Sequence, residues 1–134
     1  MNKLKVLVTG MCGRIGTVIG EKLNQDFEFT SLDLTAKQGF KSFTGDLSKL
    51  EKIQSAFESQ DAVIHLGADP RGEASWESVL QNNIVGTRNV FEASRIAGIK
   101  KVIFATTNHV VAVSYTHLRA HETLRYLVCR LLLE

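Results

Sequence analysis

The sequence predicts an α/β domain with a doubly wound parallel sheet, and three observations support this fold class. Apolar runs of strand length alternate along the chain with amphipathic stretches of helix length. The run at 61–68 is apolar almost throughout, as expected for a strand that is buried on both faces. A glycine-rich turn joins the first strand to the first helix. With right-handed crossovers, these elements predict a sheet of order 3-2-1-4-5 that is truncated after about five strands.

The composition is that of one ordinary globular domain, and it argues against several classes of protein. Of the 134 residues, 44% are hydrophobic and 22% are charged, and a net charge of +2 is too small to indicate nucleic acid or an anionic membrane as partner. No apolar run approaches the ~18 residues of a membrane span, and residues 1–5 lead into a strand rather than a signal peptide. Cys12 and Cys129 form neither a disulfide framework nor a metal-ligand spacing, so we expect no metal and a cytoplasmic location.

The first strand is expected at Leu4–Thr9, and the turn after it has the spacing of a dinucleotide-binding fingerprint. Gly10 allows a tight turn, Gly13 lets the main chain approach a pyrophosphate, and Gly16 lets the helix pack close to the strand. The phosphates would lie at the N-terminus of a helix that continues to about Asn24. The apolar residues on one face of this helix are Ile15, Ile19 and Leu23. A purely structural glycine turn is the alternative interpretation.

The second strand is expected at Phe27–Leu34, where apolar and polar residues alternate. It contains Asp33, which follows Gly16 by 17 residues. A carboxylate near this spacing accepts hydrogen bonds from both ribose hydroxyls of an adenosine and repels a 2′-phosphate. The sequence therefore predicts NAD rather than NADP as the cofactor, with a surface aspartate as the alternative.

A short third strand is expected at Phe40–Phe43. Asp46 and Leu47 follow it at the sheet edge where ligands bind in open α/β folds, so they are candidates for contact with the adenine; a simple loop is the alternative. The residues Ser48–Glu51 form a capping-box pattern that predicts the start of a helix. Its inward-facing residues would be Leu50, Ile53 and Phe57.

The fourth strand, at 61–68, contains His65, which we expect to be a hydrogen-bonded core histidine rather than a catalyst. A polar loop at 69–75 leads into a long helix from Ser75 to Ala97, which ends at Gly98. The residues predicted to face mostly inward from this helix are Trp76, Leu80, Ile84, Val90 and Phe91. The fifth strand is expected at 101–107.

Several motifs occur here in the order found in one family. They are Thr9-Gly10-x-x-Gly13-x-x-Gly16, Asp33, Gly45-Asp46-Leu47, Val63–Ala68 and Asn83-Ile84-Val85-Gly86-Thr87-x-Asn89-Val90. With them, residues 3–111 resemble the extended short-chain dehydrogenase/reductase family, the NAD-dependent epimerase/dehydratase group with a Rossmann-type domain. Residues 104–111 are most similar to the uronate dehydrogenases, which oxidise the anomeric carbon of hexuronic acids to a lactone.

This resemblance implies a set of site residues. The cofactor-binding residues would be Gly10, Cys12, Gly13, Arg14, Ile15, Gly16, Asp33, Asp46, Leu47, Leu66, Gly67, Ala68 and Asn83. Thr107 would be the catalytic hydroxyl that hydrogen-bonds the reacting group, or else a strand-end hydroxyl that caps a turn. Asn108 and His109 would contact the sugar acid, and Arg71 would pair with its carboxylate or else be a solvated loop residue.

The resemblance also implies a general base that this chain does not contain. Family members use a Tyr-x-x-x-Lys pair, in which the lysine lowers the tyrosine pKa from about 10 towards neutrality. Tyr115 and Arg119 have the spacing, but they follow Thr107 too closely, and an arginine does not replace the lysine. We therefore expect the chain to be catalytically inactive and at best a weak NAD binder.

The residues 113–134 break the pattern of the preceding chain. Their sequence matches the translation, in one reading frame, of a transposase-type sequencing adapter, so we expect an artefactual tail without a domain. We therefore do not expect His117 and His121 to be metal ligands, although they are spaced as neighbours on one helix face, nor Cys129 to be a redox group. Residues 1–112 then form an incomplete NAD-binding Rossmann domain.

The sequence is also compatible with other functions. A nucleotide-sugar epimerase or dehydratase would share the cofactor site, and so would a non-catalytic NAD-sensing module. A scaffold without a ligand is the third alternative. The full-length protein would act on a small sugar-acid substrate, and family members often form homodimers through the helices that flank the fourth and fifth strands.

Overall fold

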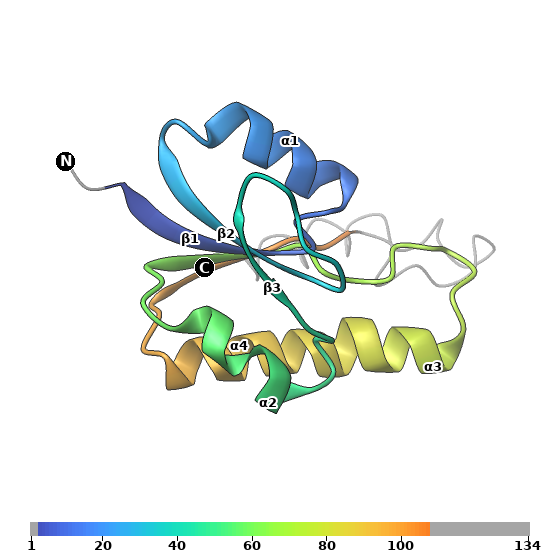
Figure 1. The fold of residues 1–134 in the computed structure, drawn as a ribbon. Coiled ribbons are helices and arrows are strands. Elements are labelled where there is room, and N and C mark those ends of the chain that lie inside the picture. Colours follow the sequence, from blue (N-terminus) through green and yellow to red (C-terminus); the bar gives the residue numbers. More distant parts are fainter. Residues whose placement is uncertain (1–2, 108–134) are drawn as a thin grey trace, which may run out of the picture.

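The computed structural model describes residues 3–107, which fold as a five-stranded parallel sheet with helices on both faces (Figure 1). The strand order β3-β2-β1-β4-β5 confirms the predicted topology. The strands are β1 (Leu4–Thr9), β2 (Phe27–Asp33), β3 (Lys41–Thr44), β4 (Ala62–His65) and β5 (Lys101–Phe104). The helical segments are α1 (Arg14–Leu23), α2 (Leu50–Ile53), η1 (Gln54–Phe57), α3 (Trp76–Ser78), η2 (Val79–Val85) and α4 (Gly86–Ile96). Three strands end earlier than predicted: β2 before Leu34, β4 before Leu66 and β5 before Ala105.

Two apolar layers hold the helices to the sheet. Because successive side chains of β1 point to opposite faces, Leu7 packs with the α2, η1 and α4 side while Val6 and Val8 pack with the α1 side. Figure 1 shows α1 alone on one face and the other helices on the opposite face. Strand β1 lies in the middle of the sheet between β2 and β4, and helices cover both of its faces, which explains its apolar sequence.

The packing of α1 differs from the prediction. Ile15 and Leu23 are exposed, and the buried residues of this helix are Gly16 and Gly20. Ile19 is half-buried and contacts the cluster of Val6, Val8, Met11 and Phe29. The two glycines bring the helix backbone close to the chain beneath it, so the face that meets the sheet is not the most apolar one.

The predicted capping box at Ser48–Glu51 is wrong. The helix α2 begins after Lys49, and no side chain caps it. The N–H of Ser48 instead donates to Oδ1 of Asp46 (2.8 Å). This Asx-type turn competes with a serine cap, because aspartate offers its carboxylate to the backbone two residues on. After one turn, α2 continues as the 3-10 segment η1.

A continuous helix connects β4 to β5, as predicted, but its middle part is π-helical. Ser75 caps its N-terminus by accepting a hydrogen bond from the N–H of Ser78 (3.2 Å). The π segment η2 changes the angle per residue, so the 3.6-residue spacing does not keep one face inward along the whole helix. Val90 is buried as predicted. Three side chains predicted to face inward are exposed instead, namely Trp76, Ile84 and Phe91.

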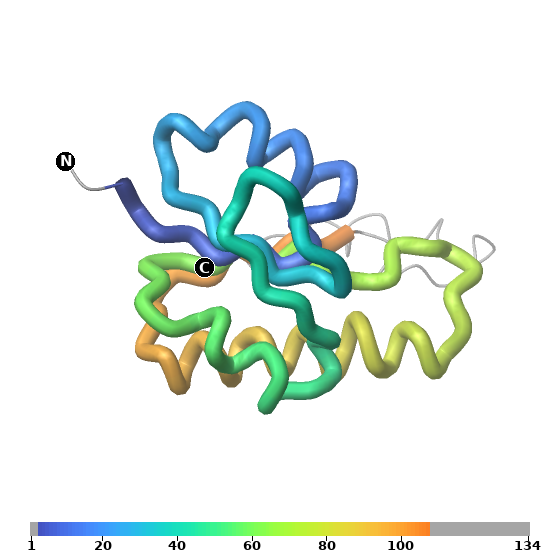
Figure 2. The backbone as a smooth tube through the Cα atoms, viewed as in Figure 1, coloured from blue at the N-terminus to red at the C-terminus, as the bar shows by residue number. Residues whose placement is uncertain are grey.

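The strands place their carboxyl ends at one edge of the sheet. The backbone trace in Figure 2 shows the turn after β1 and the loop after β4 leaving the sheet at this edge. The end of β1 pairs with the end of β4 through Thr9 and His65, and Asp33 ends β2 on the other side. Within residues 3–107, none of the helices combines the length and apolar character needed to cross a membrane.

Candidate functional site: a cavity at the glycine turn

A cavity of about 850 Å³ lies at the carboxyl edge of the sheet. Of the residues predicted to bind a cofactor, those that line it are Gly10, Cys12, Gly13, Arg14, Ile15, Gly16, Asp33, Leu47, Leu66, Gly67 and Ala68. A second hollow, of about 750 Å³, lies near Lys3, Phe27 and Lys41, and none of the predicted residues line it. The first cavity is therefore the candidate site.

The glycine turn owes its shape to Gly10 and Gly16. Gly10 has a φ of +72°, and a Cβ there would lie 2.8 Å from the nitrogen of Gly67. A Cβ on Gly16 would lie 2.6 Å from Cα of Met11, which real side chains do not tolerate. The first contact brings the turns after β1 and β4 together, and the second brings α1 against the turn. The positive φ of Gly10 and the close packing at Gly16 agree with the tight turn and the close helix approach that the fingerprint predicts.

The N-terminus of α1 opens onto the cavity. Gly13 is the N-cap residue, its backbone is extended, and no side chain caps the helix. The first hydrogen bond of the helical turn runs from the N–H of Thr17 to the carbonyl of Gly13 (2.9 Å), so the N–H groups of residues 14–16 precede it. With the helix dipole, these groups favour an anion such as a phosphate.

Asp33 lies at the end of β2 and is held by the glycine turn. Its Oδ2 accepts a hydrogen bond from the N–H of Cys12 (2.8 Å), and its Oδ1 accepts one from the N–H of Leu34 (2.7 Å). Each carboxylate oxygen has a second lone pair. The carboxylate is thus oriented at the cavity wall with acceptor capacity left for the paired hydroxyls of a ribose.

Two predicted cofactor residues do not line the cavity. The carboxylate of Asp46 accepts hydrogen bonds from Ser48, chiefly from its N–H, and these bonds hold the pKa of Asp46 below its usual value. The amide of Asn83 binds the backbone of Asp69 on both sides, accepting from its N–H (2.7 Å) and donating to its carbonyl (3.0 Å). Asn82 lines the cavity in place of Asn83, because the π segment sets which residue faces inward.

His65 is a core residue, as predicted. It is 1% exposed, and burial lowers its pKa to about 4, so the ring is neutral near pH 7. Its Nδ1 lies 2.6 Å from Oγ1 of Thr9, and its Nε2 lies 2.9 Å from Oγ1 of Thr87. Thr9 Oγ1 also accepts the N–H groups of Leu66 and Gly67, so its own proton goes to Nδ1. This places the ring proton on Nε2, where it is donated to Thr87.

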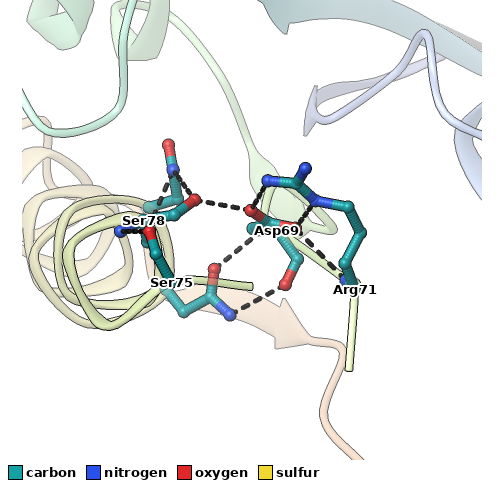
Figure 3. A network of polar contacts seen from close by, with 6 residues as sticks. Asp69, Arg71, Ser75 and Ser78 are labelled. Carbon is teal, nitrogen blue, oxygen red and sulfur yellow. Dashed lines mark hydrogen bonds and ion pairs between the residues drawn. The ribbon is translucent and has the colours of Figure 1, made fainter. Parts of the chain in front are cut away.

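A polar network holds the loop after β4 (Figure 3). Arg71 forms a two-bond ion pair with Asp69, with Nε 2.9 Å from Oδ1 and Nη2 2.6 Å from Oδ2. Ser78 donates its hydroxyl proton to the same carboxylate, and Asn82 donates to Ser78 in turn. These bonds hold the pKa of Asp69 well below its usual value, with the arginine bonds as the main cause.

Apart from Arg71, the residues predicted to contact the reacting sugar lie at the last described position, residue 107, or after it. Thr107 follows the end of β5 by three residues, on the same sheet edge as the cavity. Asn108 and His109 lie outside the described residues, as do the tail and Cys129. Among residues 3–107, no three Cys, His, Asp or Glu side chains gather closely enough to hold a metal ion.

Sequence reasoning missed the structural roles of Thr9, Asp69 and Ser78. A threonine at the end of a strand fits ordinary β propensity, so nothing in the pattern indicates that its hydroxyl joins two strand ends. Asp69 and Ser78 are nine residues apart on a loop and a helix, and no local spacing predicts their contact. The one available signal was the pairing of unlike charges at Asp69 and Arg71.

A glycine turn that opens onto a helix N-terminus, with an acid at the end of the next strand, defines a dinucleotide-binding α/β domain. The model of the NAD dependent epimerase/dehydratase family matches residues 6–127, and the chain belongs to this family. The matched range extends past residue 112 into the stretch that we expect to be a tail. The adapter origin of that stretch stays a prediction.

Characterised relatives include dehydrogenases of free sugars. The chain is 40% identical over 106 residues to the L-arabinose 1-dehydrogenase (NAD(P)(+)) of Haloferax volcanii, covering 79% of the chain and 42% of that protein. It is 34% identical over 113 residues to the uronate dehydrogenase of Pseudomonas putida, covering 80% and 42%. A mutant uronate dehydrogenase from Agrobacterium tumefaciens, solved with NAD, has a TM-score of 0.74 and 30% identity over 84% of the chain and 44% of that structure. The chain thus spans less than half the length of each of these proteins.

Proposed function

We propose that the cavity binds NAD and that the chain is the cofactor-binding part of an oxidoreductase. The observation that carries this proposal is the convergence of the open α1 N-terminus and the oriented Asp33 on one cavity. The N–H groups of residues 14–16 would hold the pyrophosphate, and Asp33 would hold the adenosine ribose. Gly67 and Ala68 would face the other half of the dinucleotide. NAD supplies a hydride acceptor when it is bound.

We further propose a sugar acid as the substrate, oxidised at its C1 hydroxyl to a lactone, as in uronate dehydrogenases. The similarity to two dehydrogenases of free sugars supports a sugar substrate. In this proposal Thr107 hydrogen-bonds the reacting hydroxyl, while Asn108, His109 and Arg71 contact the sugar. A nucleotide-sugar epimerase or dehydratase and a non-catalytic NAD-sensing module are the competing proposals.

The chain would act as part of a longer protein. It contains no Tyr-x-x-x-Lys sequence, and it spans less than half of its relatives. The exposed apolar side chains of β5, Ile103 and Phe104, lie on opposite faces of the sheet and support further elements of the longer protein that cover this strand. We also propose that the longer protein is a cytoplasmic homodimer, for which the exposed Ile84, Phe91 and Ile96 offer an apolar helix surface.

An assay of NADH formation with hexuronic acids tests this proposal. The 134-residue chain should bind NAD but give no turnover, because the general base is missing. Long-read sequencing of the source DNA across the codons for residues 111–113 should reveal a reading frame that continues to a Tyr-x-x-x-Lys pair. The longer product should then oxidise a hexuronic acid. Turnover by the chain alone would contradict the expected inactivity. A genome that encodes the tail would contradict the truncation and favour a non-catalytic NAD-binding module.

A further inference from the structure

The loop after β4 contains a charged pair whose geometry is more specific than a solvated loop requires. The side chain of Asp69 is 8% exposed, whereas that of Arg71 is 72% exposed. A buried carboxylate therefore holds an exposed guanidinium by two parallel bonds, which fixes the plane of the arginine as well as its position. An ordinary surface ion pair, in contrast, forms between two exposed side chains.

The carboxylate of Asp69 has no capacity left for another ligand. It accepts from Nε, Nη2 and the backbone N–H of Arg71 and from the hydroxyl of Ser78. Its backbone is fixed separately by the amide of Asn83. Four accepted bonds fill the lone pairs of a carboxylate, so Asp69 serves neither as a base nor as a metal ligand here.

The guanidinium of Arg71, in contrast, uses only one of its two bidentate edges. A guanidinium has five N–H donors, and the pair with Asp69 takes the Nε–Nη2 edge. Within residues 3–107, no acceptor contacts Nη1. The Nη1–Nη2 edge therefore points away from Asp69 with three donors, and this edge matches the two oxygens of a carboxylate.

The location of this edge corresponds to the sugar side of the proposed site. Pro70 and Ala68 line the cavity, and Arg71 is the next residue along the loop. This loop follows β4, whereas Asp33 follows β2 on the other side of β1. Arg71 does not itself line the cavity; it would lie beside the end that is opposite the adenosine.

We propose that Arg71 is the receptor for the carboxylate of the sugar acid and that Asp69 is the positioning residue that presents its Nη1–Nη2 edge. The proposal rests on the proposed sugar oxidoreductase function and names the part of the site that recognises the acid. Asn82, at the cavity wall, donates to Ser78, and Ser78 donates to Asp69. This chain of hydrogen bonds connects the cofactor cavity to the receptor.

The direct test observes the arginine side-chain N–H signals of the ¹⁵N-labelled 134-residue chain by NMR, with and without NAD. The probes are D-glucuronate, D-glucose and D-glucose 6-phosphate. Glucuronate should shift the Arg71 signals in a saturable way, and glucose should not. Asp69→Asn should weaken the glucuronate response about tenfold, since it loses a charge-assisted hold on the guanidinium. Ser78→Ala, which leaves the ion pair in place, should weaken it less.

The chain contains a matched control for this measurement. Arg95 makes the same two-bond pair with Glu92 on α4 (3.0 and 2.7 Å), and its side chain is also 72% exposed. Its signals should not respond to glucuronate. An equal response at Arg95, no response at Arg71, a response to glucose 6-phosphate alone, or an undiminished response in Asp69→Asn would overturn the proposal. If NAD does not shift the amide signals of Cys12 and Gly13, the proposed function fails. The Arg71 titration is also recorded without NAD, so this failure can be distinguished from a failure of the Arg71 proposal.

Discussion

His65, at the end of β4, bonds Thr9 at the end of β1 and Thr87 on α4, and its ring is neutral and buried. Burial lowers its pKa from 6.5 in the unfolded chain to about 4 in the folded one. Between these two values the unfolded state binds more protons, so the free energy of unfolding falls as the pH is lowered from 6.5 to 4. The stabilisation is fully present above pH 6.5. Between pH 6.5 and pH 4, the neutral His65 costs the fold about 3 kcal/mol of its free energy of unfolding.

Urea denaturation at a series of pH values measures this effect. His65→Gln keeps hydrogen-bonding groups near Thr9 and Thr87 but does not titrate, so its stability should be flat over this window. Asp46 and Asp69, whose pKa values are lowered, lose their contributions only as the pH falls below the ordinary aspartate value of 3.8. An unchanged slope in His65→Gln would mean that other histidines cause the pH dependence.

Gly16 and Gly72 make a matched pair for the glycine turn. Gly16→Ala would place a Cβ against the backbone of Met11, whereas a Cβ on Gly72 meets nothing within 4 Å. We expect Gly16→Ala to lower the free energy of unfolding by about 2 kcal/mol through forced backbone shifts, and Gly72→Ala to leave it nearly unchanged. Chemical denaturation of both variants gives the comparison. Equal effects would show that the close packing of α1 on the turn contributes nothing specific.

Among the elements, the helix from Trp76 to Ile96 links the site to the fold. Its π segment directs Asn82 to the cavity and Asn83 to the loop after β4. Two adjacent asparagines thus serve two different surfaces. Such π segments occur frequently at functional sites.

Asn83→Ala tests the second of these contacts. It removes both bonds to the backbone of Asp69, which should cost about 2 kcal/mol because a partly buried N–H and carbonyl lose their partner. Amide hydrogen exchange at Asp69 should accelerate clearly. Asn82→Ala, whose side chain bonds Ser78 of its own helix, should leave that amide protected. Acceleration of the same size in both variants would mean that the loop is not anchored through Asn83.

The sequence determines the elements of this fold better than their faces. The apolar runs predict β1 and β4, the handedness of crossovers predicts the strand order, and the spacing from Gly16 predicts Asp33 at the sheet edge. The same reasoning fails where a short-range side-chain hydrogen bond competes with the expected local pattern. The carboxylate of Asp46 accepts the N–H of Ser48, and the carboxylate of Asp69 pairs with Arg71. The hydrophobic periodicity of the chain predicts neither of these bonds.

For the whole molecule, the parallel sheet gathers groups from distant parts of the sequence at one edge. The turn after β1 supplies the open helix N-terminus, β2 supplies Asp33, and the loop after β4 supplies Asp69 and Arg71. In the proposed function these are the phosphate, ribose and sugar-acid contacts, and across the sheet they lie in the order ribose, phosphate, sugar acid. The central claim is that the first two form one NAD site.

Calorimetric titration with NAD tests this claim most directly, using Asp33→Asn and a matched control. Asp61 also accepts a backbone N–H through its carboxylate, from Lys5 at 2.8 Å, but it lies at the opposite edge of the sheet. We expect the 134-residue chain to bind NAD weakly, and Asp33→Asn to lower this affinity about tenfold through loss of charged hydrogen bonds to the ribose. Asp61→Asn should bind as the unchanged chain does. Absence of NAD binding, or equal affinities for the Asp33 and Asp61 variants, would contradict the account.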